Sequence, residues 1–356
     1  MKKYIIRTET GEKFNAASKA RLDADRIAAG LGYETFLFEG GRTAAGSAAG
    51  ALRLAALGLR NWRRLIRSAE PGSLILFQYP HYPMKSALLA GRMIPLARRK
   101  KNLRFAALVH DLDSLRGMHG GAAVYSDERV LPLFDAVICH NERMKAYLTG
   151  KGIPEDKIIP LGLFDYLTEA GLSCAGSEPG IAVAGNLSAE KSGYVHRLIE
   201  SAGSVPVHLF GKGLEGADLP DSAVYYGSFS PEALPGRLKG RYGLVWDGNA
   251  LETCAGKTGE YLRFNNPHKL SLYMAAGLPV VVWDQAAVAD FVREQGVGLP
   301  VSSLGRLEEA LSSVTEEQYR EMKRRAEAVG QKVCAGEYLS GALRKAEALS
   351  ERRMDR

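Results

Sequence analysis

The sequence predicts an α/β fold in which two doubly wound parallel-sheet domains, each Rossmann-like, follow one another along the chain. Short apolar runs rich in β-branched and aromatic residues alternate with longer helix-patterned segments, which is typical of parallel βαβ units. Several runs are almost continuously hydrophobic, as expected for strands covered on both faces. The 356 residues are enough for two domains with separate cores.

The first half of the chain alternates predicted strands with predicted helices. The strands are expected at residues 4–7, 35–38, 74–78, 105–110, 136–139 and 158–161. The helices are expected near residues 16–30, 52–69, 84–100 and 141–150. Together these elements define a predicted N-terminal domain over residues 1–165.

A second alternation begins after a Gly-, Ser- and Pro-containing stretch, residues 166–178, which we predict to be an interdomain linker. Its strands are expected at residues 181–184, 207–210, 224–226, 244–246, 280–283 and 299–301. Its helices are expected near residues 191–201, 231–239, 267–276 and 286–295. The second domain is predicted over residues 179–330, and residues 331–356 are predicted to form a helix that packs back on the first domain.

Ligands of doubly wound sheets bind just outside the carboxyl ends of the strands. We therefore expect the functional residues in strand-end loops that face a cleft between the two predicted domains.

The composition is that of an ordinary soluble protein, with 46% hydrophobic and 24% charged residues. It excludes a disordered, collagen-like or disulfide-scaffold chain. The four cysteines form no CxxC pair and the N-terminus has no apolar signal region, so we expect a cytoplasmic protein without a zinc ribbon. The longest uncharged apolar stretch, residues 270–283, is shorter than the ~20 residues of a spanning helix.

The net charge of +7 is concentrated in one window, residues 51–104, which carries twelve basic residues, one acid and a net charge of +11. Within it Arg53, Arg60, Arg64 and Arg67 recur at near-helical spacing around Trp62. This pattern favours peripheral contact with an anionic membrane surface, and a solvated helix face is the alternative. Binding to nucleic acid is not expected, because the window contains neither a recognised module nor interleaved stacking aromatics.

The most specific motif is the run NNPHKLSLYMAAGLPVVV, which starts at Asn265. It places a proline at the first turn of a helix, a glycine at its end and a buried strand beyond. The unpaired N–H groups at the helix start, together with Lys269, suit a pyrophosphate. The alternative is a generic helix–strand unit whose His268 and Lys269 are merely solvated.

This run, AGNLS at 184–188, YGLVWD at 242–247 and DAVICHNERMKAYLTGKGIPEDKI at 135–158 resemble the GT-B glycosyltransferases. More narrowly, the chain is similar to the bacterial galactofuranosyltransferase and glucosyltransferase-3 group, whose members modify surface polysaccharides or adhesin glycans. The resemblance implies a C-terminal domain that binds a UDP-sugar and an N-terminal domain that binds the acceptor.

The implied activity is transfer of a hexosyl group, galactofuranose or glucose, from a UDP-sugar to a glycan acceptor, which can be lipid- or protein-linked. The UDP-sugar is then a substrate, and neither a cofactor nor a metal ion is expected. A catalytically silent GT-B subunit that binds a glycan or nucleotide and a UDP-sugar epimerase remain open alternatives to this function. Assembly into a homo-oligomer is also left open.

Residue by residue, the resemblance implies that Asn186 and Lys269 contact the donor diphosphate or sugar. Asn266 and His268 lie in the same turn as Lys269 and are further candidates. Lys191 lies one turn beyond Asn186 and is a candidate phosphate contact, with a solvated surface lysine as the alternative.

Two other segments are expected on the donor side. Tyr226 and Phe229 follow a strand where related enzymes hold uracil, and an aromatic face can stack on a base; the alternative is two core aromatics. Gly211 and Gly213 begin a GxGxxG pattern that follows a late strand and not the first, which disfavours a dinucleotide site. A glycine loop near the donor and a plain turn both fit these residues.

Inverting transfer needs a base for the acceptor hydroxyl and support for the departing UDP. Asp111 follows a buried strand and is the first candidate base, His110 is the second and Asp113 the third; Asp111 can alternatively cap the next turn. Many retaining GT-B enzymes have paired glutamates where this chain has Phe264 and Leu272, so the stereochemistry stays open, with inversion favoured.

The loops over residues 8–15 and 78–83 also leave strand ends and are expected to line the acceptor side. Thr8 and Asn15 bound the first loop. In the second, Tyr79, His81 and Tyr82 are expected to offer flat ring faces for sugar stacking.

Overall fold

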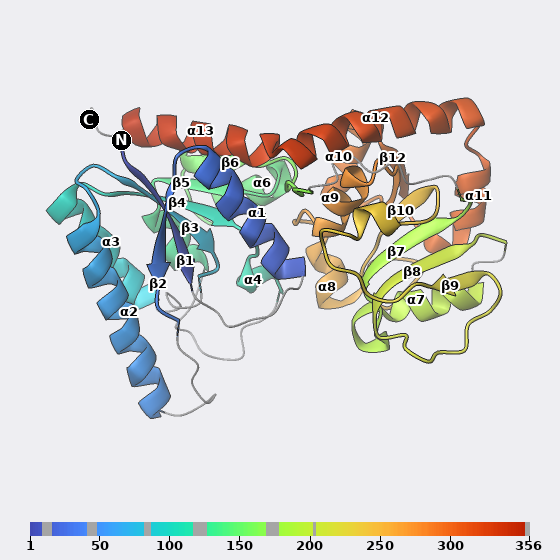
Figure 1. The fold of residues 1–356 in the computed structure, drawn as a ribbon, viewed down its shortest axis with the longest axis horizontal. Coiled ribbons are helices and arrows are strands. Elements are labelled where there is room, and N and C mark those ends of the chain that lie inside the picture. Colours follow the sequence, from blue (N-terminus) through green and yellow to red (C-terminus); the bar gives the residue numbers. More distant parts are fainter. Residues whose placement is uncertain are drawn as a thin grey trace. The chain divides into compact units, whose positions relative to one another are not determined.

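The computed structural model describes residues 1–8, 16–40, 48–81, 87–116, 127–168, 178–201 and 204–352. The chain divides into two compact units (Figure 1). The first unit comprises Met1–Lys13, Arg21–Leu161 and Leu339–Arg356, and the second comprises Phe14–Ala20 and Gly162–Tyr338.

The first unit contains a six-stranded parallel sheet of order β2-β1-β3-β4-β5-β6. Its strands are β1 (Lys3–Thr8), β2 (Glu34–Phe38), β3 (Leu74–Tyr79), β4 (Arg104–Val109), β5 (Ala136–Cys139) and β6 (Ile158–Pro160). The helices are α1 (Ala16–Gly30), α2 (Ala48–Ser68), α3 (Ala87–Lys101), α4 (Asp113–Arg116), α5 (Asp127–Val130) and α6 (Glu142–Gly150). All six strands predicted for the first half are confirmed to within one residue at each end.

Aromatic packing fills the core between this sheet and α2. Trp62 is fully buried, and its ring centroid lies 5.7 Å from that of Phe77, 5.9 Å from Phe105 and 6.3 Å from Phe38. Each such pair contributes about 0.5–1.5 kcal/mol beyond its buried area. Trp62 therefore anchors α2 to the sheet, and its expected place in a membrane-facing surface is wrong.

The second unit contains a six-stranded parallel sheet of order β12-β11-β10-β7-β8-β9. Its strands are β7 (Ile181–Asn186), β8 (Val207–Lys212), β9 (Ala223–Tyr225), β10 (Tyr242–Val245), β11 (Val280–Trp283) and β12 (Gly298–Val301). Its helices are α7 (Ala189–Ser201), α8 (Gly256–Tyr261), α9 (His268–Ala275), α10 (Val288–Gln295), α11 (Leu307–Ser312) and α12 (Glu316–Ala335). The last helix, α13 (Glu337–Arg352), lies almost wholly in the first unit.

The helix predicted over residues 231–239 is wrong. Only the 3₁₀ turn η4 (Pro235–Arg237) forms there. Pro235 lacks a backbone N–H and Gly236 disfavours helix, so the pair cannot sustain a longer segment.

The helical tail divides at Gly336, which takes the left-handed conformation that favours glycine and ends α12. Helix α12 starts with a capping box between Thr315 and Gln318, and it packs along α9 in the second unit. From Leu339 onward the chain belongs to the first unit, where Lys3 and Glu347 form an ion pair at 3.1 Å.

The strand order identifies one switch point in each sheet. In the first sheet β1 lies between β2 and β3, and in the second β7 lies between β8 and β10. Strand order reverses at these positions, and ligands of such sheets bind outside the adjoining carboxyl ends. The ends of β1 and β3 in one unit, and of β7 and β10 in the other, are therefore the candidate binding edges.

Helix α9 is fixed to the second sheet by one inserted tyrosine. The ring of Tyr273 lies against Gly243 of β10, where a Cβ atom would fall 2.2 Å from the ring Cγ. The Tyr273 hydroxyl accepts a hydrogen bond from Ala184 N at 3.0 Å and donates one to Ala182 O at 3.1 Å, both on β7. Only glycine at position 243 leaves room for this ring.

Gly243→Ala should therefore destabilise the second unit by about 2 kcal/mol or more, because the added methyl meets a ring that two hydrogen bonds hold in place. Gly341→Ala is the matched control, since no atom lies within 4 Å of its added Cβ and the position is helical. The control should leave the free energy of unfolding unchanged or raise it by up to ~1 kcal/mol. Urea denaturation measures both variants, and equal stability would contradict this account.

Candidate functional site

Lys269 lies at the switch point of the second sheet. It is the second residue of α9, whose start has no side-chain cap. Its Nζ donates hydrogen bonds to Asp247 Oδ1 at 2.8 Å and to Trp246 O at 3.1 Å, just beyond the end of β10. The side chain remains 21% exposed, so the ammonium is held in place and still accessible.

The charge of Lys269 is maintained by its partner. Burial opposes the charged form, but the Asp247 carboxylate outweighs it and raises the pKa of the ammonium above its ordinary value. A fixed cation beside the open N-terminus of a helix is an arrangement that suits an anion.

Glycines let the neighbouring strand ends approach this cation and each other. A Cβ at Gly185 would lie 3.3 Å from Lys269 Cε, and one at Gly211 would lie 1.7 Å from Gly185 O. A Cβ at Gly213 would lie 2.6 Å from Ser188 N. Gly211 and Gly213 are thus explained by close backbone packing of the loop after β7, and their contact with a donor stays a prediction.

Asn186 and Lys191 lie on the same edge. Asn186 ends β7 and is exposed, its Oδ1 accepts from Ser188 N at 3.0 Å, and its backbone oxygen accepts from Ser192 Oγ at 2.6 Å. Lys191 is exposed and forms no ion pair within the described ranges. Both side chains are placed where a ligand at the end of β7 can meet them.

The Asn266 side chain is buried and hydrogen-bonded within the second unit. It is 3% exposed, and its Nδ2 donates to Gly162 O at 2.9 Å. Ser271, on the next turn of α9, donates to Phe164 O at 2.7 Å. These bonds fasten the start of α9 to the segment at 162–164, and they give Asn266 a structural role in place of the expected donor contact.

His268 is half-buried and packs among aromatic rings, so the alternative of a merely solvated His268 is wrong. Its ring centroid lies 5.2 Å from that of Tyr166 and 6.1 Å from that of Phe164. Burial lowers its pKa to about 4, the nearby Lys19 charge adds to this, and a hydrogen bond to the backbone of Asp165 opposes it. A neutral imidazole does not present a charge to a phosphate.

The two aromatics expected near uracil differ in exposure. One face of Tyr226 stacks on Phe210, with centroids 4.8 Å apart and an interplanar angle of 6°, and its hydroxyl lies 3.1 Å from His208 Nδ1. Phe229 lies at the edge of this cluster and is 38% exposed. Of the two, Phe229 has the more accessible face for a base.

At the switch point of the first sheet, Thr8 and His81 join the ends of β1 and β3. Thr8 Oγ1 and His81 Nε2 are 2.7 Å apart. The His81 ring packs edge-on against Phe38 and Phe77, and burial lowers its pKa to about 3. The predicted flat stacking face of His81 is wrong, because the ring is only 6% exposed.

Tyr79 is also buried, so its predicted stacking face is wrong as well. Its hydroxyl donates to Asp127 Oδ1 at 2.5 Å. The other oxygen of Asp127 accepts from Ser114 N at 2.9 Å and from Ser114 Oγ at 2.6 Å, which ties the loop after β4 to the end of β3. Asn15 and Tyr82 lie outside the described residues.

His110 is oriented by Gln78. The Gln78 amide nitrogen donates to Asp25 Oδ1 at 2.7 Å and to Arg21 O at 3.2 Å, which turns the amide oxygen toward His110 Nε2 at 2.8 Å. An amide oxygen can only accept, so His110 Nε2 must carry the hydrogen of this bond. In the neutral ring, the lone pair is then on Nδ1.

This orientation depends on the ionisation of Asp25. Burial raises the pKa of Asp25 to about 6 from an ordinary 3.8, although Arg7, Arg21 and the Gln78 amide all favour the carboxylate. Above about pH 6 the carboxylate can only accept, which fixes the Gln78 amide. Because the folded state keeps this proton to a higher pH than the unfolded chain, the stability that Asp25 contributes is lost as pH rises through 6.

The carboxylate of Asp111 is held in an ion pair. Its Oδ2 accepts from a guanidinium nitrogen of Arg116 at 2.8 Å, and both side chains are about one third exposed. Asp113 begins α4 and is 4% exposed. Among the three candidate bases, His110 and Asp111 are partly accessible at the end of β4, whereas Asp113 is buried.

Sequence reasoning missed several residues of these edges. Asp247 could have been found, since it ends the YGLVWD motif immediately after a buried strand. Gln78, Asp25 and Arg116 carry no comparable signal, because each is a single polar residue whose partner is set by strand order.

No group of three His, Cys, Asp or Glu side chains suited to a metal ion occurs in the part of the chain that the structure describes. Across the same residues, every helix is too short or too polar to span a bilayer.

The chain is similar in sequence to two bacterial glycosyltransferases over more than half of its length. It is 38% identical over 282 residues to the beta-1,6-galactofuranosyltransferase WbbI of Escherichia coli K12, covering 77% of this chain and 79% of that protein. It is 31% identical to glucosyltransferase 3 of Streptococcus gordonii, over 54% of this chain and 55% of that protein.

Solved structures share the fold at low sequence identity. The lipopolysaccharide outer core galactosyltransferase WaaB superposes with a TM-score of 0.62 at 13% identity, covering 96% of this chain and 99% of that chain. Anabaena HepE in complex with UDP gives a TM-score of 0.58 at 12% identity, covering 99% of this chain and 100% of that chain. The two Rossmann-like sheets are thus those of the GT-B fold.

Two family profiles match the chain in order. The glucosyltransferase 3-like N-terminal domain matches residues 2–163, and the glucosyltransferase 3-like C-terminal domain matches residues 181–346. With both halves matched, the chain belongs to the glucosyltransferase 3-like family and is a GT-B glycosyltransferase.

Proposed function

We propose that this glycosyltransferase moves a hexosyl group, galactofuranose or glucose, from a UDP-sugar to a glycan acceptor of surface polysaccharide or glycoprotein synthesis. The names of the relatives support the two sugars, and the structures of HepE with UDP and with UDP-glucose support the donor class. The observation that carries the proposal is the accessible ammonium of Lys269 at the switch point of the second sheet.

On the donor side, Lys269 and the N-terminus of α9 bind the diphosphate. Asp247 holds the ammonium at the strand end before the donor arrives, and the phosphates then compete for the same hydrogens. Charge that develops on the departing UDP is stabilised by this cation and by the helix dipole. The proposed reaction needs no metal ion, because these groups supply the positive charge. Asn186, Lys191 and Phe229 are the further donor contacts that their positions support.

On the acceptor side, a base takes the proton of the attacking hydroxyl while the oxygen bonds to the anomeric carbon and UDP leaves. The contacts favour His110 over Asp111 as this base. Gln78 orients the His110 ring with Nδ1 as its proton acceptor, whereas the Asp111 carboxylate is engaged by Arg116. Thr8 remains a candidate acceptor contact through its position at the end of β1.

Donor binding is tested by the thermal stability of the chain with UDP, UDP-galactofuranose, UDP-glucose, UDP-galactose and UDP-N-acetylglucosamine. UDP and at least one UDP-hexose should raise the Tm. Stabilisation by none of them would exclude a nucleotide-sugar donor. Lys269→Ala should weaken binding of the ligand that raises the Tm by about 100-fold, because one charge-stabilising hydrogen-bond donor is lost.

Lys332→Ala is the matched control for Lys269→Ala, since Lys332 is exposed on α12. It should bind the donor as the unmodified chain does. Circular dichroism confirms that each variant is folded, and Lys269→Met provides a second replacement that keeps the length of the side chain. Full donor binding by both Lys269 variants would contradict the diphosphate site.

The identity of the base is tested by His110→Asn and Asp111→Asn, assayed with a donor that raises the Tm. His110→Asn should lower kcat by about 100-fold or more, the usual contribution of a general base. Asp111→Asn should lower it by less than about tenfold. A larger loss of kcat in Asp111→Asn than in His110→Asn would identify Asp111 as the base. Full activity of both variants would show that neither residue at the end of β4 is the base.

The orientation of His110 predicts a pH-dependent tautomer. Above about pH 6, where Asp25 is ionised, neutral His110 should carry its proton on Nε2. Gln78→Ala should abolish this preference, because the accepting amide oxygen is removed. Long-range ¹H–¹⁵N correlation spectra identify the tautomer, with assignment by His110→Asn. A neutral ring protonated on Nδ1 in the unmodified chain would be the contrary result.

A further inference from the structure

Helix α2 is packed at one end and uncovered at the other. Near its C-terminal end Asn61, Trp62, Leu65 and Ile66 are buried against the sheet. Residues 52–56 are all exposed, with Leu52 72% and Leu54 39% exposed. Figure 1 shows the N-terminal end of α2 reaching past the strands that it covers.

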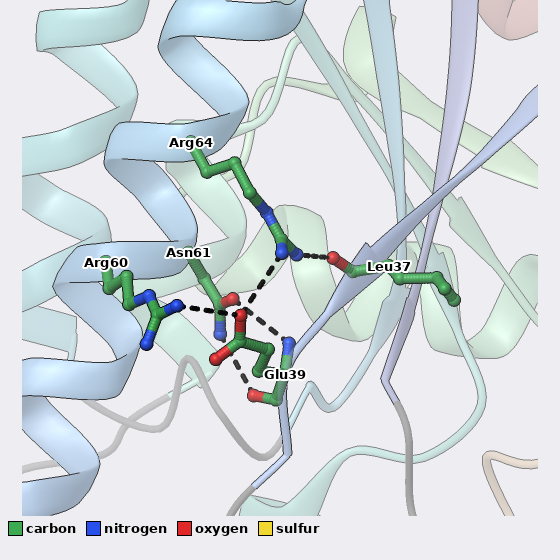
Figure 2. Close-up of polar contacts among 5 residues, drawn as sticks. All are labelled: Leu37, Glu39, Arg60, Asn61 and Arg64. Atoms are coloured by element: carbon green, nitrogen blue, oxygen red, sulfur yellow. Dashed lines mark hydrogen bonds and ion pairs between the residues drawn. The ribbon is translucent and has the colours of Figure 1, made fainter.

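Two of the arginines on α2 are tied to the end of β2 (Figure 2). Glu39 Oε1 lies 3.3 Å from Arg64 and 3.5 Å from Arg60, and Arg64 also donates to Leu37 O. Asn61 clamps the backbone of Glu39 through two hydrogen bonds of 3.0 Å. Arg60 and Arg64 were expected in a lipid-facing surface, but here they share the single carboxylate of Glu39, which offsets one of their two charges.

Three other arginines of α2 have no such partner. Arg53, Arg63 and Arg67 are exposed and form no ion pair within the described residues. At about 100° per residue they fall on the solvent-facing side of the helix together with Leu52. We call Leu52, Arg53, Arg63 and Arg67 the α2 surface; Leu54 lies on the opposite side of the helix.

The neighbouring helix reinforces the positive charge. Helices α2 and α3 lie side by side (Figure 1), and neither contains an acidic residue. On α3, Arg92, Arg99 and Lys100 are exposed without an ion pair among the described residues. Arg98, by contrast, is paired with Asp135 at 2.9 Å. The positive charge of residues 51–104 is therefore uncompensated on the solvent side of these helices.

We infer that the α2 surface binds the anionic headgroup layer of a lipid bilayer. Cations on an exposed helix are attracted to negative headgroups, and Leu52 beside them is stabilised only when an apolar layer surrounds it. A nucleic acid would match the arginines but leave Leu52 in water. The inference goes beyond the proposed transfer reaction, since the α2 surface contains none of its donor or acceptor residues.

Sedimentation with phosphatidylcholine vesicles, prepared with and without phosphatidylglycerol, tests the inference. The full chain should bind only the vesicles that contain phosphatidylglycerol. Replacing Arg53, Arg63 and Arg67 with Gln should weaken binding by about 100-fold, at about fivefold for each arginine near an anionic leaflet. Leu52→Ser should weaken it by about tenfold without changing the net charge.

The matched control removes the same three charges from the second unit by replacing Arg197, Arg320 and Lys332 with Gln, all of which are exposed. It should bind vesicles as the unmodified chain does. Equal loss in the control, equal binding to pure phosphatidylcholine, or an undiminished leucine variant would each overturn the inference. So would arginine-dependent binding of duplex DNA without vesicle binding.

Donor stabilisation should stay intact in all of these variants. A failure of lipid binding is therefore distinguishable from a failure of the proposed transferase function.

Discussion

The arrangement of the second unit depends on Tyr273 of α9, whose side chain packs against the backbones of β7 and β10. Its ring occupies the space above Gly243 on β10, and its hydroxyl bonds two backbone groups of β7, so one side chain fixes α9 against both strands of the switch point. Lys269 is four residues earlier on the same face of the helix. The same contact that packs α9 therefore aims the ammonium at the ends of β7 and β10.

The glycines around this point share a single physical cause. Backbone approaches at Gly211 and Gly213 leave no volume for a Cβ atom, and a Cβ at Gly185 would lie 3.3 Å from the Lys269 side chain; all three positions also lie in the positive φ region. The compact strand ends that result place polar groups close to one another with few intervening side chains. Asn186 and Lys269 are accessible because their neighbours are glycines.

The two strand-end edges use polar residues differently. In the second unit a lysine and an aspartate form a partly exposed charged pair, while the half-buried His268 beside them is neutral. In the first unit the polar groups form a chain from Asp25 through Gln78 to His110, which controls the direction of hydrogen bonds more than the net charge. The first arrangement suits an anionic group, and the second suits the movement of a proton.

The sequence by itself determined the fold class and the places where function was to be sought. The alternation of buried runs and helices was sufficient for both sheets, because parallel strands covered on two faces must be hydrophobic throughout. Lys269 was also identified from sequence, because a helix start next to a glycine-bounded strand is a local pattern. His81 and Tyr79 were misplaced, since an aromatic near a strand end has the same local sequence pattern whether it faces the core or solvent. Trp62 was misplaced because only tertiary packing shows which face of α2 contacts the sheet.

Only the tertiary structure decided which polar residues act together. Asp247 contacts Lys269, Gln78 contacts Asp25, and Glu39 pairs with both Arg60 and Arg64. Each contact is made by packing between elements separated in the chain. A side chain's burial and charge state depend on these partners and on the surrounding dielectric. Composition and spacing give the residue types, but they give neither the burial nor the charge state of a side chain.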